Sequence, residues 1–312
     1  TSPAQLAASM MGEGEASPPE AGLEGDAPAA LTGRALHGAA ATASDAQVLL
    51  KVEGLVAQGD RGTLAVHDLS LQVRAGEILG VAGVSGNGQR ELVEALVGQR
   101  PRLAGKVTVR GQPYLARRED NHRLKVRSLP EEPLRNACVG DLSVAENMAL
   151  RDFDQPPLAS AGFGGLLRFP VWRSRAREWI AEYGVKTQGE GAPIRSLSGG
   201  NVQRAVLARE LAGDIDVLIA ANPVFGLDFA AVAEIHSRIM QVREKGGAVL
   251  LISEDIDELL ELADRIVVMS EGRIVYECDA ATAERHVLGA HMGGGDHGHG
   301  HAHTAEPVAE AA

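Results

Sequence analysis

A glycine-rich segment between residues 83 and 90 has the spacing of a phosphate-binding loop. The run Gly83-Val-Ser-Gly-Asn-Gly88-Gln89-Arg90 follows an apolar stretch over 78–82 that predicts a strand, and it precedes a stretch with helical periodicity. In the pattern G-x-x-x-x-G-K-S/T, backbone amides surround the phosphates, the lysine neutralises the outer phosphates, and the hydroxyl binds Mg²⁺. Here Gln89 stands in place of the lysine and Arg90 in place of the hydroxyl.

These two replacements weaken the loop without removing its attraction for anions. The amino terminus of the following helix still offers partial positive charge to a phosphate. We therefore expect weak nucleotide binding and no tight binding of Mg-ATP. If the motif stood alone, a glycine-rich turn without a ligand would be the default interpretation. The loop residues expected to contact a nucleotide are Gly83, Ser85, Gly86, Asn87, Gly88, Gln89 and Arg90.

A second motif, Leu197-Ser-Gly-Gly-Asn-Val-Gln-Arg204, begins an amphipathic helix about 110 residues downstream of the loop. Ser-Gly-Gly by itself is consistent with a simple helix cap in which Ser198 satisfies orphan amides. The complete string is far more specific, and together with the loop it resembles the signature of the ABC ATPases. In that family the serine hydroxyl, the glycine amides and the helix dipole face the γ-phosphate held by a partner domain. The resemblance assigns this role in trans to Leu197, Ser198, Gly199, Gly200 and Gln203.

Other motifs of the family follow in its order, and several of them carry altered residues. By the resemblance, Glu131 replaces the Q-loop glutamine and is expected to line the weak nucleotide site with the loop residues. Glu254 replaces the switch histidine. Ala221 replaces the aspartate linked to Mg²⁺, and Asn222 replaces the glutamate that activates water. Asp228 keeps the aspartate of the D-loop, which the family uses across a dimer interface.

The nucleotide site of this chain is therefore expected to be hydrolytically inactive. The amide of Asn222 cannot act as a general base, a role that contributes roughly 10²–10⁴ in rate. Glu131 and Glu254 add negative charge where lysine and Mg²⁺ would offset that of a triphosphate. No aromatic residue stands between Val56 and Thr63, where the family stacks adenine on a ring. ATP and Mg²⁺ are expected mainly at a composite site held by a partner domain.

Apolar strands alternate with helical patterns along most of the chain, which predicts an α/β fold with a mostly parallel sheet covered by helices. The resemblance implies an ABC-type nucleotide-binding domain with a P-loop NTPase core, an antiparallel β subdomain and a helical insertion at about residues 140–195. Ser143 and Glu146 have capping-box spacing at the start of this insertion. Strands are predicted at 48–52, 69–73, 78–84, 217–221, 248–252 and 265–269, and helices at 90–97, 202–211, 232–242 and 256–263.

The ABC domain is predicted at residues 47–290, between segments of biased composition. Residues 14–46 are rich in Ala, Gly, Pro and Glu and predict a disordered linker. Residues 1–13 echo the end of the domain and are interpreted as the tail of a preceding cassette. Residues 291–312 form a tail that either binds a metal or is simply disordered and solvated, and the second interpretation is favoured. The candidate ligands in this tail are His297, His299, His301 and His303.

Composition and charge narrow the function classes further. The formal net charge of -12 and the pI near 5.3 argue against a nucleic-acid partner. Cys138 and Cys278 lack metal-ligand or paired spacing and are interpreted as packing residues. No apolar run approaches the ~20 residues that cross a bilayer, and no secretory signal is present at the start. We expect a cytoplasmic protein, peripheral on the inner face of the cell membrane.

Within the ABC family, the sequences of these motifs most resemble those of the second cassette in tandem importer subunits for simple sugars and nucleosides. That resemblance implies a first ABC cassette, transmembrane permease subunits and, indirectly, an extracytoplasmic solute-binding protein as partners. The expected function is half of an importer ATPase, inactive alone, whose signature completes the partner's site. A silent structural or regulatory ABC domain is the alternative. A non-transport ABC protein of translation or DNA repair is less favoured, because basic arms and long coiled-coil insertions are missing.

Overall fold

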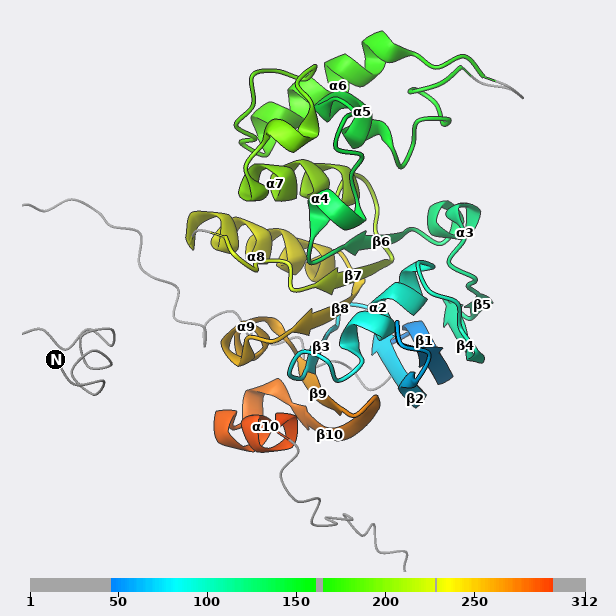
Figure 1. Ribbon diagram of the computed structural model, residues 1–312, viewed down its shortest axis with the longest axis vertical. Coiled ribbons are helices and arrows are strands. Elements are labelled where there is room, and N and C mark those ends of the chain that lie inside the picture. The colour runs from blue at the N-terminus through cyan, green and yellow to red at the C-terminus, as the bar shows by residue number, and fades with distance from the viewer. Residues whose placement is uncertain (1–45, 161–164, 228, 294–312) are drawn as a thin grey trace, which may run out of the picture.

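The computed structural model describes residues 46–160, 165–227 and 229–293, which contain two β-sheets and the helices around them (Figure 1). The segment predicted at 1–13, nearly all of the predicted linker, the four tail histidines and Asp228 lie outside the described residues.

The larger sheet has the strand order β10-β9-β3-β8-β7-β6. Its five strands from β9 to β6 are parallel, whereas β10 pairs antiparallel with β9. A mostly parallel sheet was predicted and is confirmed. The strands are β3 (Ile78–Ala82), β6 (Val126–Leu129), β7 (Val217–Ala221), β8 (Ala248–Ser253), β9 (Arg265–Ser270) and β10 (Arg273–Asp279).

Every residue of β3, β7 and β8 is buried, because both faces of the sheet are covered. Successive side chains of a strand point to opposite faces. Leu218 therefore packs into the core on one face, while Val217 and Ile219 pack into the core on the other. This explains why the strands appear in the sequence as continuous apolar runs.

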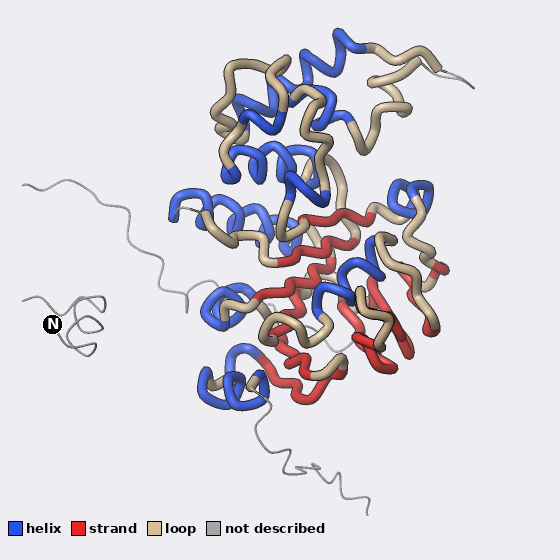
Figure 2. The backbone as a smooth tube through the Cα atoms, viewed as in Figure 1, coloured by secondary structure: helices blue, strands red, loops and turns tan. Residues whose placement is uncertain are grey.

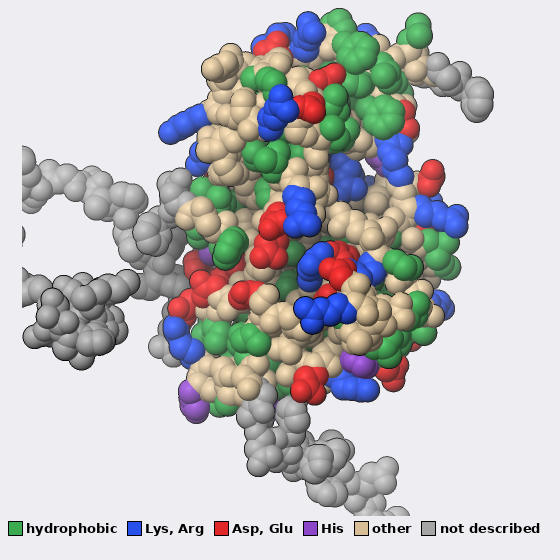
Figure 3. Space-filling view, viewed as in Figure 1, with side chains coloured by type: hydrophobic (Ala, Val, Ile, Leu, Met, Phe, Trp, Pro, Cys, Tyr) green, Lys and Arg blue, Asp and Glu red, His purple; other side chains and the backbone are tan. Residues whose placement is uncertain are grey.

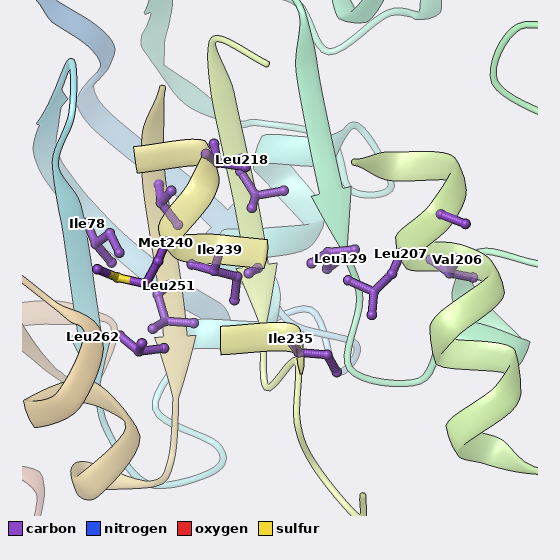
Figure 4. Packing of buried hydrophobic residues seen from close by; sticks show 14 of the residues in the cluster. Ile78, Leu129, Val206, Leu207, Leu218, Ile235, Ile239, Met240, Leu251 and Leu262 are labelled. Atoms are coloured by element: carbon purple, nitrogen blue, oxygen red, sulfur yellow. The ribbon is translucent and has the colours of Figure 1, made fainter. Parts of the chain in front are cut away.

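Helices cover the face of the larger sheet from which Leu218 projects, called the first face below (Figures 1 and 2). Figure 4 shows side chains of α7 and α8, with Leu262 of α9, packed against strand residues such as Leu129, Leu218 and Leu251. These helices are α7 (Gly199–Glu210), α8 (Phe229–Glu244), α9 (Ile256–Leu262) and, beside β9, α10 (Arg285–Met292).

An antiparallel sheet and one helix cover the second face. The helix α2 (Gln89–Val97) buries Leu92, Ala95 and Leu96 in this second core. The sheet has the order β2-β1-β4-β5, which confirms the predicted antiparallel subdomain. Its strands are β1 (Val48–Gln58), β2 (Leu64–Arg74), β4 (Ala104–Val109) and β5 (Gln112–Pro113).

Helical structure fills much of the region between β6 and α7, at the top of Figure 1. The predicted capping box is confirmed, since the Ser143 amide donates to Glu146 Oε2 at 2.8 Å and the Glu146 amide donates to Ser143 Oγ at 3.2 Å. The remaining helical elements within the described residues are α3 (Arg118–Arg123), α4 (Pro133–Asn136), α5 (Val144–Ala149), α6 (Phe169–Glu182), η2 (Ile194–Ser196) and η3 (Ala280–Thr282).

The structure extends the sequence predictions in two places. Strands β4, β5 and β10 were not predicted, because none of them is a continuous run of buried residues and β5 has only 2 residues. Helix α10 runs to Met292, two residues beyond the predicted boundary at 290, and the Met292 side chain is buried. Cys138 and Cys278 are partly buried against the first core, as expected for packing residues.

A fully buried carboxylate fixes α7 to its surroundings. Glu210, the last residue of α7, accepts hydrogen bonds from Arg151 Nε at 2.8 and 2.9 Å and from Arg209 Nε at 2.8 Å. Arg151 also donates to Ser128 Oγ of β6, and Arg209 donates to the carbonyl of Asn147 in α5. This network sets the position of α7 relative to the sheet and to the inserted helices.

We predict that Glu210→Gln lowers the free energy of unfolding by about 3–5 kcal/mol, because it leaves two guanidinium groups without their buried counter-charge. Burial raises the pKa of Glu210, but the charges of Arg151 and Arg209 outweigh it and hold the pKa below its ordinary value of 4.5. The stabilisation is therefore complete above pH 4.5 and is lost as the pH falls through the folded-state pKa. Thermal unfolding at pH 7 and at pH 3–4 tests both statements.

The matched control is Asp214→Asn, which removes the exposed ion pair with Lys125 at 2.9 Å. Its unfolding midpoint should equal that of the unchanged protein. An equally small effect of Glu210→Gln at pH 7 would show that the network does not hold α7.

Candidate functional site

The glycine-rich segment 83–88, called the phosphate loop below, connects β3 to α2 and is held by contacts within the chain. Gly88 has a φ of 99°, and a Cβ there would lie 2.2 Å from the carbonyl oxygen of Ala65 in β2. Asn87 Oδ1 accepts from the amide of Glu271 at 3.0 Å, and its carbonyl accepts from the amide of Gly272 at 2.9 Å. The loop therefore keeps its shape without a ligand.

Gln89 folds back onto the phosphate loop. Its side chain is buried, with 8% exposure, and its Nε2 donates to the carbonyl of Val84 at 3.1 Å. A Cβ added to Gly83 would lie 2.0 Å from the same Nε2. The residue that stands in place of lysine thus bonds to the loop itself instead of reaching toward a phosphate.

Arg90 points to acidic side chains outside the loop. Its Nε donates to Glu94 Oε1 at 2.8 Å, and a second guanidinium nitrogen lies 3.5 Å from Asp60 Oδ2. The hydrogen bond to Glu94 raises the pKa of Arg90 further above its ordinary value, and the guanidinium is charged with or without it. The i,i+4 spacing of Arg90 and Glu94 is visible in the sequence, but the contact with Asp60 requires the fold.

The structure brings the altered family positions together around one cavity of about 210 Å³, called the loop cavity below. Because β3, β7 and β8 are adjacent and parallel, the segments that follow them open at the same edge of the sheet. Asn87 and Gly88 do not line the cavity, since they face β2 and the β9–β10 turn. The predicted residues that do line it are Gly83, Ser85, Gly86, Gln89, Arg90, Glu131, Ala221, Asn222 and Glu254.

Asn222 is locked in place by its neighbours. It adopts a positive φ of 41°, its amide donates to the carbonyl of Ile252 at 2.8 Å, and its Oδ1 accepts from the amide of Glu254 at 3.1 Å. The side-chain oxygen is therefore bonded to the backbone next to the cavity. An amide in this arrangement cannot accept a proton from a water molecule.

A buried hydrogen-bonded chain lies behind Glu254 and was not predicted. Ser253 Oγ donates to Glu258 Oε2 at 2.6 Å, and Glu258 Oε1 lies 3.1 Å from Nε2 of His236. Ser253 Oγ also accepts from the amide of Asp255 at 3.0 Å. These contacts fix the turn that carries Glu254, and no sequence motif indicated them.

The residues of the loop cavity do not fit tight Mg-ATP. Position 221 presents a methyl group and position 90 a guanidinium, so neither supplies the oxygen ligand that Mg²⁺ requires. Gln89 occupies the inner side of the loop, and no lysine lines the cavity. Glu131 and Glu254 are exposed carboxylates without an ion pair among the described residues, so they repel a triphosphate.

The amino-terminal tip of α7, formed by Ser198, Gly199 and Gly200, lies away from the loop cavity. Ser198 and Gly199 are exposed, and nothing lies within 4 Å of a Cβ added to Gly199. Ser198 makes no side-chain bond to a helix amide; its Oγ accepts from Asn201 Nδ2 at 2.8 Å. The interpretation of Ser198 as a simple side-chain cap is therefore not supported. The first amides of a helix have no partner within it, so this tip can bind an anion from another molecule.

Two solved structures share this architecture at low sequence identity. One, described as the ATP-binding subunit of an ABC transporter, aligns with a TM-score of 0.64 over 78% of this chain and 99% of its own, at 17% identity. The other, the dimeric ATP-binding cassette MJ0796 bound to ADP and Pi, aligns with a TM-score of 0.61 over 74% of this chain and 99% of its own, at 20% identity. The fold is therefore that of an ATP-binding cassette, as the sequence predicted.

The ABC transporter family matches residues 66–224, so the chain belongs to that family. It is 40% identical over 257 residues to the nucleoside import ATP-binding protein NupA of Lactococcus lactis subsp. cremoris, with 82% of this chain and 50% of the relative aligned. It is 37% identical to the guanosine import ATP-binding protein NupO of Bacillus subtilis, with 79% and 48% aligned. The chain thus spans about half the length of the curated relatives that it matches.

The described part of the chain contains neither a membrane-spanning helix nor a metal-binding cluster. None of the helices within 46–160, 165–227 and 229–293 is long and apolar enough to cross a membrane. No group of three or more His, Cys, Asp or Glu residues with a metal-binding arrangement occurs there. The histidine tail, which held the only candidate metal ligands, lies outside these residues.

We predict that ATP binds the chain weakly and that Mg²⁺ does not tighten the binding, because Ala221 and Arg90 offer the ion no ligand. Gln89→Lys should increase ATP affinity about tenfold, since a charged hydrogen bond to a phosphate contributes roughly 1.5–3 kcal/mol. Isothermal titration with ATP, with and without Mg²⁺, measures both effects. Micromolar, Mg²⁺-dependent binding by the unchanged chain would contradict this description of the cavity.

Proposed function

We propose that this chain is one cassette of an importer ATPase and that its signature completes the active site of a partner cassette. The observation that carries the proposal is a separation within one molecule: the tip of α7 is exposed and free to bind an anion, while the loop cavity is unsuited to Mg-ATP. A partner cassette with an intact phosphate loop would supply the nucleotide, Mg²⁺ and the catalytic base.

The chemical contribution of this chain is electrostatic. The hydroxyl of Ser198, the free amides at Gly199 and Gly200 and the helix dipole would stabilise charge on the γ-phosphoryl group during its transfer. Such donors act strongly because the fold holds them in place before the reaction. The buried contacts of Glu210 at the far end of α7 support this rigidity.

The relatives' names and the family resemblance support a proposal for the transported solute and the partners. The relatives are described as importers of nucleosides, guanosine and ribose. We assign this chain to import of nucleosides or simple sugars, as the second cassette of a tandem subunit at the cytoplasmic face of the membrane. Transmembrane permease subunits and a first cassette would be direct partners, and an extracytoplasmic solute-binding protein an indirect one.

A silent structural or regulatory cassette is the second candidate. Two hydrogen bonds favour it: Gln89 bonds to the carbonyl of Val84, and Asn222 bonds to the amide of Glu254. Because both side chains are already paired within the chain, neither requires a nucleotide as a partner. The two candidates differ in one respect: only the first requires Ser198 to contact a reacting nucleotide.

We predict that the isolated chain has negligible ATPase activity and that an assembly with an intact first cassette is active. Ser198→Arg in that assembly should lower kcat about 10²–10³-fold, because it replaces a hydroxyl that donates a hydrogen bond to the γ-phosphate with a bulky side chain at the helix tip. The control is Ser237→Arg, at an exposed position of α8. Unchanged activity of Ser198→Arg would favour the silent cassette, and full activity of the isolated chain would refute both candidates.

A further inference from the structure

A second cavity, of about 390 Å³, lies beside the tip of α7. We call it the signature groove; it is lined by Glu131, Leu134, Gly199, Gln203, Phe225 and Leu227, among others. Figure 3 shows basic and acidic side chains gathered at the mid-height of the face drawn. It shares Glu131 with the loop cavity but has a different, mainly apolar lining.

The base of the signature groove holds a buried hydrogen-bond acceptor without a donor. Gln203 is 4% exposed, and its Nε2 donates to the carbonyl of Pro223 at 2.9 Å. That bond fixes the amide orientation, because a reversed amide would set two oxygens against each other. Oε1 therefore faces the other way, and no donor reaches it in the described part of the chain. A buried acceptor without a donor costs free energy.

The walls of the groove are apolar and unusually exposed. Phe225 is 72% exposed and Leu134 is 41% exposed, although both are large hydrophobic side chains. An exposed phenylalanine ring offers its face to a cation as well as to an apolar group. The walls thus suit an occupant that has an apolar stem.

The rim of the groove carries one uncompensated negative charge. Glu132 is neutralised by Arg135 at 3.3 Å, whereas Glu131 forms no ion pair within the described residues. The occupant should therefore carry a positive charge and N–H donors at the end of an apolar stem. Lysine and arginine are the side chains with this combination.

We infer that the signature groove receives a lysine or arginine side chain of the partner cassette. The stem would lie against Phe225, and the cationic head would reach Glu131. This inference rests on the proposed function: since Gly199 lines the groove, a cassette whose nucleotide contacts the tip of α7 also covers the groove. A small cation would match the charge of Glu131 but not the apolar walls.

Photochemical crosslinking in the assembled transporter identifies the occupant. Phe225 is replaced by p-benzoylphenylalanine, which keeps the aromatic ring, and adducts are located by mass spectrometry after proteolysis. We expect the adduct in a peptide of the partner cassette that contains lysine or arginine. An adduct in a permease, in this chain itself or in a peptide without a basic residue would overturn the inference, as would the absence of any adduct.

A charge reversal tests the electrostatic part. Glu131→Lys in the crosslinking background should lower the adduct yield about tenfold, because like charges then face each other across the groove. The matched control is Glu119→Lys, an exposed glutamate on α3 outside the groove, which should leave the yield unchanged. Equal yields from the two variants would overturn the electrostatic match.

The ATPase test of Ser198→Arg separates the two proposals. If that variant loses activity while the adduct forms elsewhere, the groove assignment fails and the proposed function stands. If Ser198→Arg keeps full activity, the proposed function itself fails.

Discussion

The hydrogen bond from Gln89 Nε2 to the carbonyl of Val84 determines how the rest of the site can work. A lysine at this position would extend toward the outer phosphates of a nucleotide, whereas the glutamine amide turns inward and bonds to the loop. The carbonyl of Ala65 and the β9–β10 turn hold the loop from outside. The loop therefore persists as a structural element that fixes the entry into α2, without requiring a ligand to order it.

In the function that we propose, this cassette acts through α7. Its amino-terminal tip is exposed, while its carboxyl-terminal end is anchored by the buried carboxylate of Glu210 and two arginines. A rigid helix with a free tip can stabilise charge on a nucleotide that another domain binds. The apolar signature groove beside the tip is the second surface that we propose for the same partner.

Much of the architecture could be predicted from the sequence, because strands buried on both faces are continuous apolar runs, as in 217–221 and 248–252. Strand β10 could not be predicted in this way, since all of its residues are exposed or only partly buried. The sequence also identified the altered residues around the loop cavity. It could not predict that Gln89 folds inward or that Asn222 bonds to the amide of Glu254, because both depend on space left by distant segments.

The most direct test of the central claim is a structure of the assembled, ATP-bound transporter that locates every nucleotide. We expect ATP to lie between the phosphate loop of the partner cassette and Ser198, Gly199 and Gly200 of this chain, with Gln89 still bonded to Val84. A nucleotide held with Mg²⁺ in the loop cavity, with the tip of α7 facing solvent, would contradict the claim.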